Sequence, residues 1–215
     1  QNYTSDPDNP LVGQVWYNST SNSLKYFYVN PGAWATGNSM NTARARLAGA
    51  GTQTAALAFG GYPTVALTET WNGTNWAEVN DLNTARGYMA AAGTNTAALA
   101  FGGYNGGTLY ALTETWNGTN WTAVNDLNTA RQKLAGAGTN TAALAFGGSP
   151  PYLAVTETWN GTNWTEVADL NTARENLAGA GTNTAALAFG GGVPALTGAT
   201  EEWNQGPATA TITTD

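Results

Sequence analysis

The chain repeats its own sequence, and this repetition restricts the possible folds more strongly than any other feature. A 19-residue segment at Thr68–Arg86, TETWNGTNWAEVNDLNTAR, returns at residues 113–131 and 156–174, and the last two copies differ at two positions. Four arginines mark equivalent points and are 42, 45 and 43 residues apart: Arg44, Arg86, Arg131 and Arg174. A period near 44 residues is the length of one four-stranded propeller blade and is too short for a sandwich domain.

Local patterns within each unit predict β-strands. The segment TAALAFGG, found four times, is a short apolar run ended by glycines, as expected for a buried strand that enters a turn. Leu112, Glu114 and Trp116 share one face of an alternating segment. The Asn-Gly-Thr-Asn that follows favours a hairpin turn, which would bring Trp116 and Trp121 together. A helix is disfavoured, because Leu-Ala-Gly-Ala-Gly would cost about 1 kcal/mol for each internal glycine.

We therefore predict an all-β fold with four strands in each unit. In the third unit the expected strands are Leu134–Gly138, Thr141–Phe146, Val155–Trp159 and Trp164–Val167. The order of features resembles a kelch repeat: Gly-Gly after the second strand, an acidic and aromatic third strand, a Trp after a tight turn, and an Arg before the next unit. This resemblance covers roughly residues 33–204 and implies a β-propeller. Trp71-Asn72 stands where the kelch family usually has Tyr-Asp, and these units are shorter and more uniform.

The N-terminal stretch carries a degenerate form of the same pattern. Val29–Trp34 aligns with the hairpin turn of the repeats. Trp34 precedes Arg44 by ten residues, which is the spacing of Trp76 and Arg86. Two upstream segments are then expected to form the second and third strands of an incomplete blade: Leu11–Asn18 and Leu24–Asn30.

Closure of the ring depends on both ends of the chain. If Thr209–Thr213 supplies the missing strand of the N-terminal blade, the propeller has five blades, and the terminal strands close the ring; we favour this count. The alternative is a ring of four blades, in which Thr209–Thr213 completes the fourth blade and residues 1–40 form a separate appendage. The Ala- and Gly-rich first strands favour a narrow ring in either case. The predicted layout is one propeller domain over residues 1–215, with a degenerate blade at 1–40, repeats near 44–86, 86–131, 131–174 and 174–204, and a closing strand at 205–215.

Composition excludes several classes of function. The chain has no Cys and no His, so disulfides, Cys/His zinc sites, Ser-His-Asp or Cys-His catalysis and histidine pH switching are ruled out. Charged residues make up 10% of the chain and the net charge is -7, which disfavours a nucleic-acid partner. No apolar run reaches the roughly 18 residues of a membrane helix, so we expect no membrane insertion.

Acidic residues recur with the repeats. They are Glu69, Glu114, Glu157 and Glu202, together with Asp81, Asp126 and Asp169, each Asp standing five residues before an Arg. A carboxylate present in every blade is usually part of the scaffold, because an acid and a nucleophile need two different environments. The segment Asp-Leu-Asn-Thr also lacks most of the ligand positions of a calcium-binding loop. We expect ion pairs and turn contacts here, with no catalytic residue, no metal and no cofactor.

The nine tryptophans allow two interpretations, stacking on sugar rings or packing between blades, and their place at repeated hairpin positions favours packing. The variable segments are better site candidates, because loops on a rigid scaffold usually carry the binding residues. They lie after each Gly-Gly and after each Arg, and they are rich in adaptable contact residues. Unconstrained drift of these loops remains an equal alternative. The predicted binding residues are Tyr62, Tyr104, Asn105, Tyr110, Tyr152 and Tyr88.

A second resemblance lies at the start of the chain. Gly13-Gln14-Val15-Trp16-Tyr17-Asn18, followed by polar residues and Leu24-Lys25-Tyr26, resembles a short hairpin motif of bacteriophage tail and tail-fibre proteins. Together with the kelch-like units, the motif implies a virion protein and therefore an extracellular particle as its location.

This resemblance leads to two main hypotheses of function. The first is a non-enzymatic adhesion or receptor-binding propeller that contacts a host-surface glycan or protein through its loops. The second is a purely structural tail or decoration component that contacts only other virion proteins. A homo-oligomer is possible under either hypothesis. A polysaccharide hydrolase is the least favoured hypothesis, because near-identical repeats offer little asymmetry for a catalytic pocket.

Overall fold

The computed structural model describes residues 2–28 and 32–206, and every regular element in this part of the chain is a β-strand. The all-β prediction is confirmed. The chain divides into two compact units, residues 1–37 and 38–215, where the sequence predicted a single domain. The two units are described separately below.

The N-terminal unit contains three short strands, β1 (Asn2–Tyr3), β2 (Val15–Asn18) and β3 (Ser23–Tyr26). The predicted hairpin is present as β2 and β3, but β1 pairs parallel with β2, unlike the antiparallel strands of the repeats. One carboxylate organises this sheet: Asp6 accepts hydrogen bonds from Lys25 Nζ, Asn18 Nδ2 and Trp16 Nε1. These three bonds, that of Lys25 foremost, lower the pKa of Asp6 to about 2.

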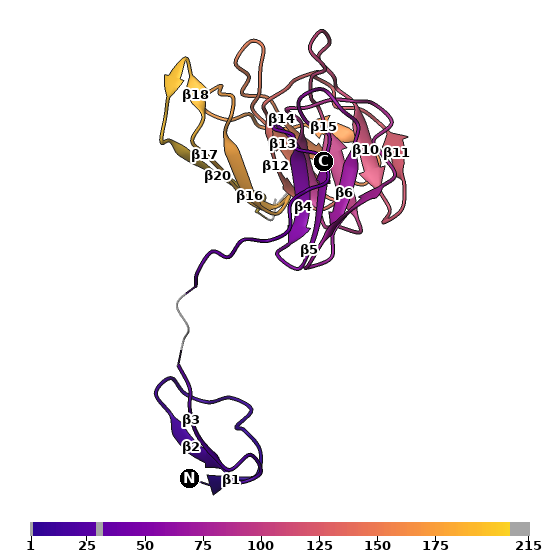
Figure 1. Cartoon of the computed structure of the whole chain (residues 1–215). Helices are drawn as coiled ribbons and strands as arrows, with labels where there is room; N and C mark the ends of the chain where they lie inside the picture. Colours follow the sequence, from indigo (N-terminus) through magenta and orange to yellow (C-terminus); the bar gives the residue numbers. More distant parts are fainter. Residues whose placement is uncertain (1, 29–31, 207–215) are drawn as a thin grey trace, which may run out of the picture. The chain divides into compact units, whose positions relative to one another are not determined.

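Among the described residues, the larger unit contains one main sheet for each of the four repeats and a separate two-stranded sheet in repeat 4 (Figure 1). Repeat 1 has β4 (Ala48–Thr52), β5 (Ala55–Phe59), β6 (Thr68–Trp71) and β7 (Trp76–Val79). Repeat 2 has β8 (Ala90–Gly93), β9 (Ala98–Phe101), β10 (Thr113–Trp116) and β11 (Trp121–Val124). Repeat 3 has β12 (Ala135–Gly138), β13 (Ala143–Phe146), β14 (Thr156–Trp159) and β15 (Trp164–Glu166). Repeat 4 has β16 (Ala178–Gly181), β17 (Ala185–Phe189) and β20 (Thr200–Asn204), and a small hairpin, β18 (Gly192–Val193) with β19 (Ala195–Leu196), lies between the last two strands.

In repeats 1 to 3 each sheet is an antiparallel meander in which strands that follow one another along the chain pair side by side. In repeat 4 β17 pairs with β20, and the hairpin of β18 and β19 lies between them in the chain. Across the turn of each predicted hairpin the two tryptophans stand opposite each other, as Trp116 and Trp121 do in repeat 2. The third-repeat strands lie inside the predicted ranges. These features confirm four-stranded, blade-like sheets in repeats 1 to 3.

The small residues of the first strands let consecutive repeats approach closely. β8 lies next to β4, β12 next to β8, and β16 next to β12. A Cβ atom at Gly136 would lie 2.5 Å from Phe101 Cζ of the preceding repeat, and one at Gly179 would lie 2.6 Å from Phe146 Cζ. The phenylalanines of repeats 2 and 3 therefore pack directly on the glycine backbone of the next repeat, which explains the Ala-Gly-Ala-Gly sequence of repeats 3 and 4. Repeat 2 has Ala91 at the equivalent position.

In the described part of the chain, no sheet closes the repeats into a ring. The alignment of Val29–Trp34 with the hairpin turn of the repeats implies a fourth strand that begins at Trp34. This strand is not formed: residues 32–37 are irregular, and the Trp34 side chain is fully exposed. The expected closing strand, Thr209–Thr213, lies outside the described residues. Both the five-bladed and the four-bladed ring therefore stay predictions.

Candidate functional site

The repeated acidic and basic residues form buried ion pairs. Arg44 Nη1 lies 2.7 Å from Glu69 Oε1, Arg131 Nη2 lies 3.2 Å from Glu157 Oε1, and an equivalent pair joins Arg86 and Glu114; their side chains are at most 3% exposed. Burial lowers the pKa of Arg131, while Glu157 beside it favours the charged form. The pairs confirm the predicted scaffold role.

Repeat 4 corrects one member of the predicted series. Arg174 Nη2 pairs with Glu201 Oε1 at 3.0 Å and not with Glu202. Glu201 stands two residues before Trp203, as Glu157 stands two before Trp159, so Glu201 is the equivalent residue. Because side chains alternate along a strand, Glu202 faces the other side of β20.

The repeated aspartates hold turns together. Asp81, Asp126 and Asp169 each accept a hydrogen bond, of 2.9, 2.9 and 3.0 Å, from the backbone N–H that begins the third strand of the same repeat. Within residues 2–28 and 32–206, no group of three or more acidic side chains is placed to hold a metal ion. The three aspartates thus form the turn contacts that the sequence pattern predicts.

The paired tryptophans lie between repeats. The Trp121 ring is 4.7 Å from that of Phe59, and the Trp164 ring is 5.0 Å from that of Phe101. Each indole N–H also donates a 3.0 Å hydrogen bond to a threonine hydroxyl of the preceding repeat, Trp121 to Thr68 and Trp164 to Thr113. The interpretation of these tryptophans as interblade packing is confirmed.

The two kinds of variable segment meet on one face of the larger unit. In every repeat, the residue after Gly-Gly forms a β-bridge with the residue that follows the repeated Arg: Ala45 with Tyr62, Gly87 with Tyr104, Gln132 with Ser149, and Glu175 with Gly192. We call the surface formed by these segments the loop face. The sequence identified both kinds of segment, and the pairing shows that they form one continuous surface.

Three of the predicted site residues come together on the loop face. Tyr62, Tyr88 and Tyr104 line a pocket of about 80 Å³, and Arg46 forms part of its wall. The Arg46 guanidinium carbon lies 4.5 Å from the centre of the Tyr88 ring and 5.1 Å from that of Tyr62. Such distances are typical of cation–π contacts. The pocket therefore combines aromatic faces with a positive charge.

The remaining predicted residues lie in two loops. Asn105 Nδ2 donates a 2.6 Å hydrogen bond to the Tyr110 hydroxyl, and the Asn105 carbonyl accepts one from Thr64 Oγ1, so this loop is tied to the loop of repeat 1. Tyr152 is exposed in the loop of repeat 3 and does not line the pocket. The structure thus groups Tyr62, Tyr88 and Tyr104 and leaves Tyr152 apart.

A second set of residues lies at the centre of the loop face, and the sequence analysis named only Tyr88 among them as a binding residue. Arg46, Tyr88, Lys133 and Asn176 line one cavity of about 520 Å³ and all have a positive φ of 54–57°. A chain of backbone hydrogen bonds connects them, from Tyr88 N–H to the Arg46 carbonyl, Lys133 N–H to that of Tyr88, and Asn176 N–H to that of Lys133. Each stands two residues after a repeated Arg, a spacing that would have identified them.

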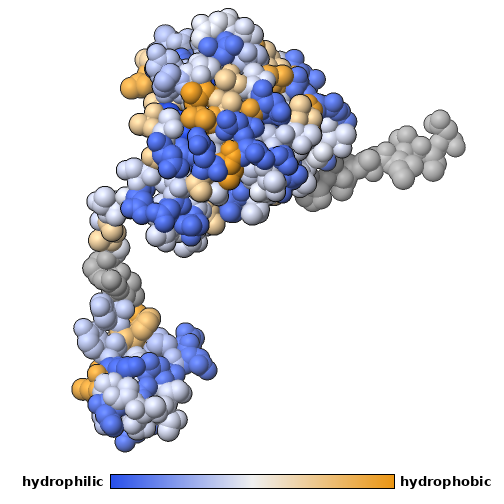
Figure 2. Space-filling view, turned by 45° about the vertical axis from the view of Figure 1, so that its right-hand side comes forward, coloured by the Kyte–Doolittle hydropathy of each residue, from blue (hydrophilic) through white to orange (hydrophobic). Residues whose placement is uncertain are grey.

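Lys133 and Glu175 add charge to this centre. Lys133 Nζ lies 3.0 Å from Glu175 Oε1 and 6.0 Å from the Tyr88 ring centre. In the part of the chain that the structure describes, no carboxylate pairs with Arg46, so its positive charge is not neutralised. On the face of the larger unit seen in Figure 2, apolar residues occur in small groups among hydrophilic ones.

Comparisons with known proteins give no family. No protein-family model matches the chain, and the search of curated proteins found no significant match. Among the described residues, no helix is long and apolar enough to cross a membrane.

Proposed function

We propose that the protein is a non-enzymatic binding module of a virion, a kelch-like β-propeller whose loop face contacts a glycan on the host surface. One observation carries this proposal: Tyr62, Tyr88 and Tyr104, from segments that differ between otherwise near-identical repeats, meet around Arg46 in one pocket. Variation concentrated in the loops of one face of a largely uniform scaffold is the arrangement expected of a recognition surface.

The chemistry of the pocket suits a sugar. The tyrosine rings, exposed at Tyr62 and half-buried at Tyr88 and Tyr104, offer flat apolar faces for the C–H side of a sugar ring, and their hydroxyl groups offer hydrogen bonds at a low entropy cost. Arg46 carries a charge that no described carboxylate neutralises, which favours a glycan bearing acidic groups. The other strong charges of the repeats are buried in Arg–Glu pairs, so the proposal gives them no catalytic role.

The virion location has a separate basis. It depends on the resemblance of Gly13–Tyr26 to the hairpin motif of phage tail proteins, and on a low charge and lack of Cys that suit an extracellular particle. The glycan-binding proposal does not depend on this location and can be tested by itself.

The experiment is a binding assay of the full chain on host cells and on a panel of neutral and acidic glycans. Tyr104→Ala and Arg46→Gln change the pocket, and Tyr152→Ala is the matched control, an exposed tyrosine of the same face outside it. We expect the pocket variants to bind about tenfold more weakly, a loss of about 1.4 kcal/mol, and the control to bind like the parent. Equal binding by parent and pocket variants would show that the ligand binds elsewhere.

A structural virion component is the second candidate. The near-identity of the repeats and the buried ion pairs between their strands favour a scaffold, because both serve stability and not recognition. This function predicts no binding by the parent chain to any glycan or to host cells. The same assay therefore separates the two candidates.

A further inference from the structure

The cavity at the centre of the loop face is large enough to hold a ligand. Its volume of about 520 Å³ lies within the range of about 300–1,000 Å³ that is typical of small-ligand sites, whereas the tyrosine pocket of about 80 Å³ lies well below that range. Arg46 and Tyr88 line both spaces, so the pocket and the cavity adjoin each other. A sugar that contacts the tyrosines of the small pocket therefore extends over the central cavity as well.

The side chains around the central cavity are not the ones that their backbone conformation favours. Arg46, Tyr88, Lys133 and Asn176 stand at one equivalent position of the four repeats, and each has a positive φ of 54–57°. Of these residue types only Asn adopts this conformation readily, so repeats 1 to 3 carry less favourable residues there. Unfavourable backbone conformations are typical of functional sites. The choice of side chain at this position therefore points to a ligand, since the turn itself would be served best by Asn or Gly.

The Arg46 side chain is oriented by aromatic rings and keeps its hydrogen-bond donors free. Its guanidinium carbon lies over the Tyr88 ring, 4.5 Å from the ring centre, and over the Tyr62 ring at 5.1 Å. Stacking on a ring uses the face of a guanidinium group and leaves the N–H groups at its edge for other partners. Within the described residues, these N–H groups form no hydrogen bond and no ion pair. Such an edge matches the two oxygens of one carboxylate, which it binds through two parallel hydrogen bonds.

The charges around the central cavity favour a group with a single negative charge. Lys133 adds a second cation, with its Nζ atom 6.0 Å from the centre of the Tyr88 ring. Glu175 accepts hydrogen bonds of 3.0 and 3.2 Å from Lys133 Nζ and so balances the charge of this lysine. Arg46, Lys133 and Glu175 together leave one positive charge. This charge matches a carboxylate better than a phosphate monoester, which carries a charge of about −1.5 to −2 at neutral pH.

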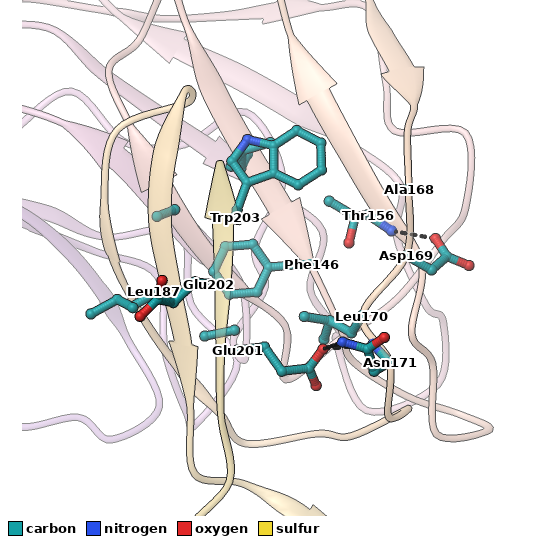
Figure 3. Close-up of a pocket in the computed structure, with 13 residues that line it drawn as sticks. Phe146, Thr156, Ala168, Asp169, Leu170, Asn171, Leu187, Glu201, Glu202 and Trp203 are labelled. Carbon is teal, nitrogen blue, oxygen red and sulfur yellow. Dashed lines mark hydrogen bonds between the residues drawn. The ribbon is translucent and has the colours of Figure 1, made fainter. Parts of the chain in front are cut away.

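A second cavity, beside β20 at the end of repeat 4, has the opposite charge. It has a volume of about 70 Å³, and in the two preceding repeats the corresponding place is filled by a fourth-strand tryptophan whose N–H donates to a threonine. The equivalent threonine in repeat 4 is Thr156. Three carboxylates are among the residues that surround this cavity in Figure 3, which include Asp169, Glu201, Glu202, Phe146, Thr156 and Trp203. Because like charges repel, an acidic ligand fits the central cavity and not this one.

We infer that the glycan bound by the loop face carries a carboxylate, as uronic and sialic acids do, and that this carboxylate binds the edge of the Arg46 guanidinium in the central cavity. Lys133 lies on the same cavity and adds to the attraction, while the sugar ring contacts Tyr88 and extends into the tyrosine pocket. This inference rests on the proposed function, for which it names the class of glycan and the position of its acidic group.

The first experiment measures binding of the full chain to oligosaccharides of uronic and sialic acids, each in three forms: with the free carboxylate, as the methyl ester, and with the carboxyl group reduced to an alcohol. Sulfated oligosaccharides test the other singly charged group. We expect the carboxylate form of at least one sugar to bind about tenfold more tightly than its two neutral forms, as is typical of a hydrogen-bonded charge pair.

The outcomes separate this inference from the proposed function. Equal binding of the three forms, a preference for sulfated sugars, or no binding of any carboxylate form overturns the inference. The proposed function then still stands if the chain binds host cells or neutral glycans through the pocket residues. A chain that binds no glycan and no host cell contradicts both.

Variants combined with the ligand forms locate the acidic group. Arg46→Asn introduces the residue that repeat 4 has at this position, so the variant should keep the circular dichroism and the unfolding curve of the parent. It should weaken the carboxylate form about tenfold more than the methyl ester, because only the carboxylate form loses a charged partner. Lys133→Gln should have a smaller effect of the same kind, roughly threefold, since Glu175 already balances this lysine.

Two further variants act as controls. Tyr104→Ala changes the tyrosine pocket and should weaken both ligand forms by similar factors. Thr156→Val changes the cavity of Figure 3 and should bind both forms like the parent. If Arg46→Asn weakens the carboxylate form and the methyl ester equally, or if Thr156→Val removes the preference for the carboxylate, the acidic group does not bind at Arg46 and the inference is wrong.

Discussion

The interior junctions of the array and its two open ends contain the same residues in different surroundings. Phe101 and Phe189 both stand in the sequence Ala-Leu-Ala-Phe-Gly-Gly, yet Phe101 is fully buried and Phe189 is 40% exposed. The difference comes from the next repeat, which covers Phe101 with Trp164, whereas within the described residues no following repeat covers Phe189. Burial in this fold is thus decided by the neighbouring repeat and not by the local sequence.

The ion pairs show the same contrast. The carboxylate of Glu157 in repeat 3 is 0% exposed, and that of Glu201 in repeat 4 is 14% exposed. At the end of the array, where the carboxylate is partly exposed to water, removal of its partner should lower the free energy of unfolding less, because solvent replaces part of the interaction. Identical substitutions at equivalent positions of an interior repeat and of repeat 4 should therefore change the stability by different amounts. Each substitution in repeat 4 thus has a matched control in an interior repeat.

The largest difference is expected at the arginines. Arg131→Met leaves Glu157 charged and buried, and this should lower the free energy of unfolding by about 3–5 kcal/mol. Arg174→Met leaves the partly exposed Glu201, so its effect should be clearly smaller. Denaturant unfolding followed by tryptophan fluorescence measures both values. Equal losses for the two variants would show that solvent access at repeat 4 does not reduce the cost of an unpaired carboxylate.

Removing the phenylalanine rings should show the next largest contrast. Phe101→Ala opens a cavity between repeats 2 and 3 and should cost about 3–5 kcal/mol. Phe189→Ala removes a ring that is already partly in water and should cost no more than about 2 kcal/mol. The unfolding measurements are made at a low protein concentration, because any association through an exposed end face would add to the apparent stability. A cost for Phe189→Ala as large as that for Phe101→Ala would mean that the end face is covered in solution.

Most of the fold could be predicted because the same strand and turn patterns recur in successive repeats. Periodic apolar runs, Gly-Gly stops and Asn-Gly turns located the strands of repeat 3 within one to two residues, and the pairing of Trp116 with Trp121 followed from the turn alone. The N-terminal sheet was less predictable. Its β1 lies far from β2 in sequence and pairs parallel to it, and no short-range pattern encodes such a contact.

The candidate site was predicted in part. Variable positions pointed to Tyr62, Tyr88 and Tyr104, but the convergence of these residues depends on bridges between loops and post-arginine segments, which join residues distant in sequence. Arg46 was missed because its candidate role depends on its contacts with the Tyr62 and Tyr88 rings, and contacts between repeats cannot be predicted from composition. The choice of Glu202 over Glu201 was an error of register, since a shift of one residue reverses the face of a strand.

A smaller contrast is expected at the threonines that accept an indole N–H. Thr113→Val removes the acceptor of Trp164 Nε1 and leaves that buried N–H without a partner, at a cost of about 1–2 kcal/mol. Thr156→Val removes a hydroxyl beside the empty cavity, where no described indole donates to it, and should change the stability by about 0.5 kcal/mol or less. Paired unfolding curves measure the two effects. A similar loss from Thr156→Val would indicate that an indole occupies the cavity in solution.

The smallest effect concerns the charge that links repeats 3 and 4 on the loop face. Burial raises the pKa of Glu175, but hydrogen bonds from Ser149, Lys133 and Asn176 together with the Lys133 charge lower it more, so the pKa lies below its usual value of 4.5. A carboxylate with a pKa lowered by folding stabilises the protein above its unfolded pKa and loses this contribution as the pH falls through the folded pKa. Glu175→Gln should therefore reduce the free energy of unfolding by about 1 kcal/mol or less at neutral pH, and the difference from the parent should shrink below about pH 4.5. Unfolding curves of both proteins from neutral to acidic pH measure this, with Glu78→Gln, an exposed glutamate of repeat 1, as the control. A difference that stays constant with pH would show that the stabilisation does not come from the charge of Glu175.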